Sequence, residues 1–297
     1  RNKVTPKTKV VLVQHTFGLP VEIEKVRKVV GPEVKVVEDI AHALGGVYKD
    51  QKIGTIGDAS ILTFGIEKVI SSVRGGMILT KDDEVAKKLK TEQEELPEFS
   101  LVRIKIALLN PIFWWLITPI YYLGIGKVTI GRVFSVIAHK LGIMGIMIED
   151  EEYLTQKPNW LPAKMPSALA RLGTNQFRKL DGFNSHRRKI AEIYSKKLGI
   201  EYKIPKNSTH TYLRFPLLLD QKKLINLKYK TKKAHFVLGD WYKTILYATE
   251  SSLEKLGYKK GDTPVAEKIS KQIVNLPTGI NVHKEFANKL MEIYSDL

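Results

Sequence analysis

The sequence predicts an α/β fold with a mostly parallel sheet in its first third, followed by a smaller α+β C-terminal domain. Two observations carry this prediction. Up to about residue 90, short continuous apolar runs alternate with helical patterns, as in strands that helices cover on both faces. From about residue 165 onward, amphipathic helical patterns surround a short strand pattern. A chain of 297 residues is long enough for one large domain or two ordinary ones.

The first third follows a strand–helix order. We expect strands over residues 8–14, 34–37, 59–64 and 76–80. Apolar residues at helical spacing predict helices over residues 21–30 and 81–90. Chemistry in such a sheet lies just beyond the carboxyl ends of the strands, where Asp39 and Thr63 fall.

Helical patterns dominate the last part of the chain. Residues 165–198 predict one long or kinked helix that ends at Gly199. A strand over 211–219 is interrupted by Pro216, which is typical of an edge strand. Amphipathic helices are expected over the two final segments, 263–276 and 283–297. We therefore divide the chain into a large α/β domain (1–99), an apolar insert (100–160) and a C-terminal domain (161–297).

Composition excludes several classes of protein. The absence of cysteine rules out disulfides, thiolate metal sites and a cysteine nucleophile, and seven scattered histidines without HExxH predict no metal site. Lys and Arg number 48 against 31 acidic residues, a net charge of +17. This excess favours phosphorylated metabolites or an anionic membrane, although a solvated lysine-rich surface also explains it. No nucleic-acid-binding signature is present, so nucleic acid is not an expected partner.

The insert has an unusual composition. Residues 106–126 carry no charge and include two Trp and two Tyr, with Arg103, Lys105, Lys127 and Arg132 at the flanks. A second apolar stretch covers 133–148. Over 100–148 we consider a hairpin in contact with an anionic membrane, or a buried dimer-interface or lid element. A membrane span is disfavoured because Pro111 and Pro119 are expected to break the helix.

A carboxylate and a lysine follow two of the predicted strands. Asp39 closes one strand, and Lys68 comes 29 positions later, after another. Convergence of these two groups at one sheet edge suits pyridoxal phosphate (PLP), whose aldehyde a lysine holds and whose ring nitrogen a carboxylate keeps protonated. Burial helps the lysine to react, because it favours the neutral amine.

Several motifs strengthen this interpretation. They read EDIAHALG at 38–45, GTIGD at 54–58, TFGIEK at 63–68 and GGM at 75–77. Together they resemble the DegT/DnrJ/EryC1/StrS family of sugar aminotransferases, which are PLP-dependent enzymes of the aspartate aminotransferase-like fold type I. QHTFG at 14–18 and the segment 264–277 are also similar to the family. The resemblance covers most of the chain except roughly residues 95–160.

The resemblance implies roles for individual residues. Lys68 would be the catalytic Schiff-base lysine, and Asp39 would pair with the pyridine nitrogen. His42 would lie at the oxygen side of the cofactor ring, and Thr63 would bind its phosphate. Three further residues are weaker candidates for substrate contacts: His15, Arg74 and Arg214. Every one of these site residues also has a plainer alternative role. Asp39 could cap a helix, His15 could be a turn residue, and the two arginines could be solvated side chains.

The activity that the resemblance implies is transfer of an amino group, from glutamate, to a keto-sugar linked to a nucleotide. Such a reaction belongs to surface-polysaccharide or amino-sugar biosynthesis. We expect a homodimer, because relatives build each pocket from two chains. A cytoplasmic location is expected, with membrane association on the cytoplasmic face left open.

Two departures from the family pattern favour an alternative. The family's phosphate-cradling helix start and ring-stacking aromatic residue fall upstream of residue 1, so we expect a missing N-terminal segment. Pro162 stands where the family has an Asn that reaches a neighbouring subunit. The alternative is a non-catalytic, membrane-associated or regulatory homologue with a decayed pocket.

Overall fold

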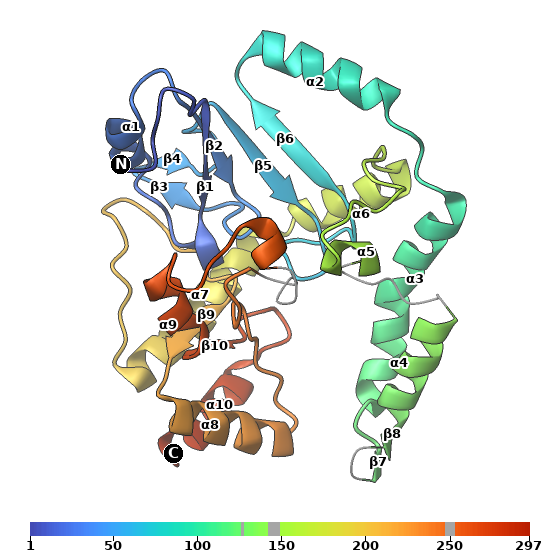
Figure 1. Cartoon of the computed structure of the whole chain (residues 1–297). Helices are drawn as coiled ribbons and strands as arrows, with labels where there is room; N and C mark the ends of the chain where they lie inside the picture. Colours follow the sequence, from blue (N-terminus) through green and yellow to red (C-terminus); the bar gives the residue numbers. More distant parts are fainter. Residues whose placement is uncertain (126–127, 142–148, 247–252) are drawn as a thin grey trace.

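A four-stranded sheet forms the centre of the first third of the chain (Figure 1). The computed structural model describes residues 1–125, 128–141, 149–246 and 253–297. The strand order is β1–β2–β5–β6, with bounds Val10–Gln14, Lys35–Asp39, Ala59–Thr63 and Gly76–Thr80. β1, β2 and β5 are parallel, whereas β6 is antiparallel to β5. The mostly parallel sheet expected from the sequence is therefore confirmed.

Smaller elements complete this part. They are η1 (Thr16–Gly18), α1 (Ile23–Val30), β3 (Val47–Tyr48), β4 (Gln51–Lys52) and α2 (Asp83–Glu95). Both predicted helices are present. α2 begins where Asp82 accepts hydrogen bonds from the amides of Glu84 and Val85, and it buries no residue. β6 differs from expectation because its apolar side chains are not covered: Met77 is 49% exposed.

The long helical pattern of the C-terminal part forms two helices. α6 (Ser167–Phe177) and α7 (Leu180–Leu198) are separated at Arg178 and Lys179. α7 ends as predicted at Gly199, whose φ of 64° lies in the left-handed region that glycine adopts without strain.

The predicted helix over 263–276 is wrong in its second half. α9 covers only Pro264–Ser270, and β10 (Ile273–Leu276) pairs antiparallel with β9 (Phe215–Leu218). All four residues of β10 are buried, and a short run buried on every side has no periodicity to separate strand from helix. The remaining elements here are α8 (Gln221–Lys233), η4 (Glu254–Leu256) and α10 (Lys284–Ser295).

Two large apolar cores hold these parts together. One lies between the C-terminal helices and β9–β10, where Tyr194, Phe215 and Leu290 are fully buried. The other packs Ile40 and Leu62 of the sheet region with Leu180, Trp241 and Ile273 of the C-terminal part. The two regions thus share a core at the carboxyl edge of the sheet.

The insert forms a helical hairpin that runs beside the C-terminal part of the molecule (Figure 1). It consists of α3 (Leu101–Ile117), η2 (Thr118–Ile120), β7 (Gly124–Ile125), β8 (Val128–Thr129) and α4 (Ile130–Lys140), followed by α5 (Asp150–Tyr153). The expected break at Pro111 is wrong, because α3 continues through it; a proline removes one N–H, and α3 has enough further turns to remain helical. Residues 126–127 and 142–148 of the predicted apolar stretches lie outside the described residues.

By length and composition, one stretch of the described chain could cross a membrane. It is Leu101–Ile120, with a mean hydropathy of 1.4 and 17% of the window buried.

Candidate active site

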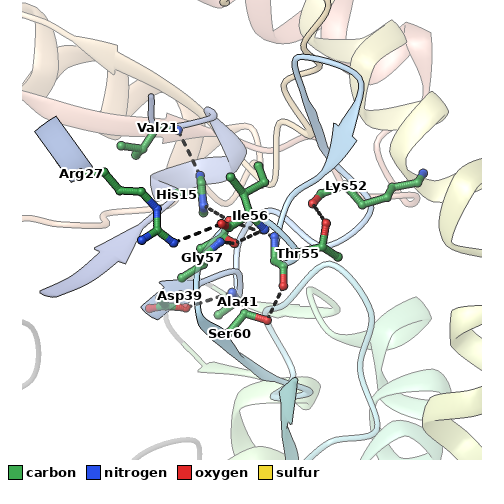
Figure 2. A network of polar contacts seen from close by, with 12 residues as sticks. His15, Val21, Arg27, Asp39, Ala41, Lys52, Thr55, Ile56, Gly57 and Ser60 are labelled. Atoms are coloured by element: carbon green, nitrogen blue, oxygen red, sulfur yellow. Dashed lines mark hydrogen bonds and ion pairs between the residues drawn. The ribbon is translucent and has the colours of Figure 1, made fainter. Parts of the chain in front are cut away.

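A buried carboxylate organises the turn beside the sheet (Figure 2). Glu38, on β2, is fully buried. Its Oε1 accepts hydrogen bonds from the amides of Ile56 (2.8 Å) and Gly57 (2.6 Å), and its Oε2 accepts one from the amide of Gly54 (3.0 Å). These bonds hold the GTIGD turn against the strand that ends in Asp39.

His15 belongs to the same network (Figure 2). Its Nδ1 accepts a hydrogen bond from the amide of Val21 (3.0 Å), so the ring proton lies on Nε2, which faces Glu38 Oε2 at 3.1 Å. His15 is fully buried, and both its nitrogens are occupied within the chain. This geometry corrects the expected substrate contact: His15 supports the turn that precedes the site.

The same network controls the charge of Glu38. Burial alone would raise the pKa of its carboxyl group, but the hydrogen bonds from His15 and three backbone amides outweigh burial and lower it. Glu38 is therefore an ionised anchor inside the fold.

Asp39 stands at the carboxyl end of β2, as predicted. Its Oδ1 accepts a hydrogen bond from the amide of Ala41 (3.0 Å), and its Oδ2 accepts one from Gln14 Nε2 (3.1 Å). One oxygen thus closes the turn after β2; the helix-cap alternative considered above is wrong, because residues 40–45 form a turn and not a helix. The other oxygen lies toward the end of β1, and the role of Asp39 toward a pyridine nitrogen stays a prediction.

Lys68 and His42 meet at the carboxyl edge of the sheet. His42 Nδ1 accepts a hydrogen bond from the amide of Phe17 (3.2 Å), and His42 Nε2 lies 3.3 Å from Lys68 Nζ. Because Nδ1 is an acceptor, the proton of the neutral ring lies on Nε2 and points at Nζ. A neutral lysine amine can accept that proton, whereas an ammonium group cannot.

Burial favours the neutral form of both groups. It lowers the pKa of His42 to about 3, and the charges of Lys68 and Arg214 act in the same direction. Burial also lowers the pKa of Lys68, although the carboxylates of Asp39 and Glu67 oppose this effect. The site therefore holds a lysine that loses its proton more easily than an exposed one.

Sequence reasoning missed Trp241. Its ring stacks on His42 with centroids 5.3 Å apart and an angle of 7° between the planes. Lys68 Nζ lies 5.2 Å from the Trp241 ring centroid. Two hydrogen bonds with the Asn275 side chain fix the Trp241 backbone. Trp241 lies 173 positions after Lys68 in sequence, so only the folded chain brings them together.

The two predicted arginines already have acidic partners. Arg214 Nη2 lies 2.9 Å from Glu67 Oε2, and its guanidinium carbon lies 4.4 Å from the Trp241 ring centroid. Arg74 pairs with the buried Glu149 at 2.5 Å. Arg214 is thus next to Lys68 in the fold, and a substrate contact for either arginine stays a prediction.

An open cleft of about 1360 Å³ runs from Lys68 along β6 to α2 and to residues 160–166. Residues along its wall include Thr63, Lys68, Arg74, Trp160, Pro162 and Trp241. The fold therefore brings Thr63, Lys68 and Arg74 to one cleft, with Asp39 and His42 at the same strand ends, while His15 lies buried behind them. A cleft of this size is large enough for a cofactor and a substrate together.

The α/β fold of this chain is similar to the folds of solved sugar-aminotransferase structures. The structure of DesV from S. venezuelae in complex with a ketimine intermediate has a TM-score of 0.69 and 17% identity, covering 99% of this chain and 66% of that one. PseC of Helicobacter pylori, an aminotransferase involved in the biosynthesis of pseudoaminic acid, has a TM-score of 0.66 and 17% identity, covering 99% and 68%.

The chain belongs to the DegT/DnrJ/EryC1/StrS aminotransferase family, whose model matches residues 1–98 and 138–294. The uncharacterized protein MJ1066 of Methanocaldococcus jannaschii is 27% identical over 285 residues, which is 93% of this chain and 63% of that protein. The GDP-perosamine synthase of Escherichia coli O157:H7 is 24% identical over 307 residues, covering 99% of this chain and 68% of that enzyme. The chain thus spans less than two thirds of MJ1066, and the family match leaves out most of the α3–α4 hairpin.

Proposed function

We propose that this chain is the catalytic part of a PLP-dependent aminotransferase that transfers an amino group from glutamate to a nucleotide-linked keto-sugar. The observation that carries the proposal is the contact of Lys68 Nζ with the neutral His42 ring, 3.3 Å apart at the carboxyl edge of the sheet. A lysine with a lowered pKa facing a large cleft is suited to bind an aldehyde.

The residues present fit PLP. Lys68 offers the amine, Asp39 a carboxylate at the neighbouring strand end, and Thr63 an exposed hydroxyl on the cleft wall. His42 offers a ring proton on Nε2 that can be donated to an oxygen of the cofactor in place of Lys68 Nζ. When bound, PLP supplies an electron sink for the pair of electrons left as the substrate loses its α-proton.

Proton movement belongs to the chain's own residues. Lys68 Nζ accepts and returns the substrate proton, and burial lowers its pKa, which makes the neutral amine easier to reach. His42 remains neutral, since its pKa is about 3, and so acts as a hydrogen-bond donor with no change of charge. Glu67 holds the Arg214 guanidinium beside the site, where it can receive the carboxylate of the amino donor.

The substrate class rests on the relatives. Two GDP-perosamine synthases match this chain, and a neighbouring structure is the E. coli GDP-4-keto-6-deoxy-D-mannose-3-dehydratase with bound hydrated PLP. These names support a nucleotide-linked keto-sugar in amino-sugar or surface-polysaccharide biosynthesis. We also propose a homodimer, in keeping with the family's two-chain pockets.

The test is multiple-turnover formation of 2-oxoglutarate. The full-length protein is incubated with PLP, glutamate and GDP-4-keto-6-deoxy-D-mannose as a probe. We expect 2-oxoglutarate in excess of enzyme only when the keto-sugar is present, and none with Lys68→Ala. Lys88→Ala, on the exposed surface of α2, is the matched control and should retain activity. If the amount of 2-oxoglutarate does not exceed the amount of enzyme, transfer to this sugar is contradicted.

A further inference from the structure

The α3–α4 hairpin presents apolar side chains to solvent along both helices. On α3, Ile112, Trp115 and Leu116 are 51%, 75% and 57% exposed. On α4, Val133, Phe134 and Val136 are 44%, 49% and 55% exposed. By contrast, α2 presents mostly charged and polar side chains to solvent. A contiguous apolar surface of this kind marks a contact with lipid or protein.

The body of the molecule contacts the hairpin at its base and near its turn, where the rings of Tyr122 and His235 have centroids 4.4 Å apart. Ala107 is 2% exposed and packs with Val73 and Leu169 in a small apolar cluster. Between these two contacts, α3 and α4 run beside the C-terminal part of the molecule (Figure 1). The cluster fixes the hairpin firmly to the cleft region and leaves its outer apolar faces uncovered.

The charges of this segment have one sign. Between Glu98 and Glu149 the sequence has no acidic residue, and its basic residues are Arg103, Lys105, Lys127, Arg132 and Lys140. The whole chain carries a net charge of +17. A contact with another protein does not in general explain an excess of basic residues. Basic residues beside exposed apolar side chains do complement anionic lipid headgroups.

The aromatic residues of the hairpin agree with a lipid contact. Trp114 and Tyr121 lie 6.1 Å apart, and Tyr121 contacts Tyr122 with ring centroids 5.0 Å apart. Trp and Tyr are enriched where membrane proteins meet the headgroup region. We propose that the α3–α4 hairpin docks this protein on a bilayer that carries anionic lipids.

Docking would also position the cleft. The Arg103 guanidinium lies 4.3 Å from the ring centroid of Trp160, a residue of the cleft wall. The guanidinium carbon of Arg74 lies 5.0 Å from the same ring centroid. A hairpin held in the lipid surface would therefore fix the position of the cleft wall relative to that surface.

Flotation with lipid vesicles tests the proposal. The full-length protein is mixed with vesicles of phosphatidylcholine alone, or of phosphatidylcholine and phosphatidylglycerol, and floated through a density gradient. The hairpin variant is Ile112→Glu with Leu116→Glu, two exposed positions one helical turn apart. The matched control is Ile225→Glu with Val265→Glu, which are 62% and 70% exposed on α8 and α9. Both variants add two negative charges, so they differ only in location.

We expect wild type and control to float with the anionic vesicles, more than with phosphatidylcholine alone. The hairpin variant should lose roughly 100-fold in partitioning, because carboxylates enter the apolar contact. Circular dichroism and melting temperature should match in all three proteins. The proposal is overturned if wild type does not float, or if the hairpin variant floats like the control. If wild type fails to float and the hairpin variant forms a smaller assembly by light scattering, the hairpin is instead a contact between two copies.

Discussion

Lys68 and His42 contact each other in a buried setting that disfavours the charged form of each. The backbone amide of Phe17 occupies His42 Nδ1 and leaves the ring proton directed at Lys68 Nζ. Burial acts in the same direction on both, by lowering the pKa of His42 to about 3 and the pKa of Lys68. A ring N–H that faces Nζ cannot accept a hydrogen bond from an ammonium group, so this contact suits the amine form of Lys68.

The pH dependence of Lys68 modification tests this arrangement. PLP is added to the protein, borohydride fixes the adduct, and peptide mass mapping measures the modified fraction of each lysine. Because the pKa of Lys68 is lowered, its neutral fraction rises with pH earlier than that of an exposed lysine, and labelling should reach its plateau at lower pH. Lys88 in the same digest is the internal reference. Identical pH midpoints for both lysines would contradict the arrangement.

Glu38 is the second residue on which the site depends. Glu38→Ala leaves the His15 proton and three backbone amides without their acceptor, so we expect a loss of about 3 kcal/mol in the free energy of unfolding. Its lowered pKa means that this stabilisation is complete above the ordinary value of 4.5 and is lost as the pH falls below it.

Urea unfolding at neutral and acidic pH measures the effect. The difference between wild type and Glu38→Ala should narrow as the pH falls below 4.5. Glu84→Ala, on exposed α2, serves as a control for removal of a carboxylate. A Glu38→Ala protein as stable as wild type at neutral pH would show that the turn does not need this anchor.

Some of these residues could be predicted from sequence and others could not. Lys68, Asp39, His42 and Thr63 stand in one short run of motifs at predicted strand ends, so local pattern was sufficient to nominate them. Trp241 reaches the site only through tertiary packing, and nothing around it in sequence marks it. The burial of His15 likewise depends on a distant partner, here Glu38, 23 positions away.

At the scale of elements, α7 offers a direct comparison of two glycines. Gly199 ends the helix with a φ of 64°, whereas Gly182 lies within the helix; an added methyl group would meet open space at both positions. Gly199→Ala forces an L residue into the left-handed region and should destabilise by about 1 kcal/mol. Gly182→Ala removes backbone freedom from the unfolded chain and should stabilise by up to about 1 kcal/mol.

Thermal unfolding of the two variants gives the comparison. Opposite shifts in melting temperature are expected, since neither position has a neighbour that could clash. Equal shifts would mean that the conformation at the end of α7 differs from the one described.

Elements with an amphipathic or alternating pattern were predictable, and elements buried on all sides were not. α1, α2 and α10 fall where periodicity placed them. The sequence predicts a continuation of α9 where β10 lies, because all four residues of β10 are buried and no exposed face alternates with a buried one. α3 passes Pro111 although proline disfavours helix, since one local preference does not outweigh the rest of a 17-residue helix.

At the scale of the whole molecule, the site depends on the union of two regions. The sheet supplies Asp39, His42 and Lys68, and the C-terminal part supplies Trp241 and Arg214 through the core that both share. The predicted domain boundaries at residues 99 and 160 enclose the hairpin. A division of the rest of the chain into two separate domains would cut through the common core and separate the two halves of the site.

The visible absorption spectrum of the full-length protein with added PLP tests the central claim most directly. We predict an absorption band from PLP held by Lys68, which fades when glutamate is added and is absent in Lys68→Ala. Lys88→Ala should keep both the band and its response. A wild-type protein without the band, or a Lys68→Ala protein that retains it, would contradict the assignment of Lys68 as the residue that holds the cofactor.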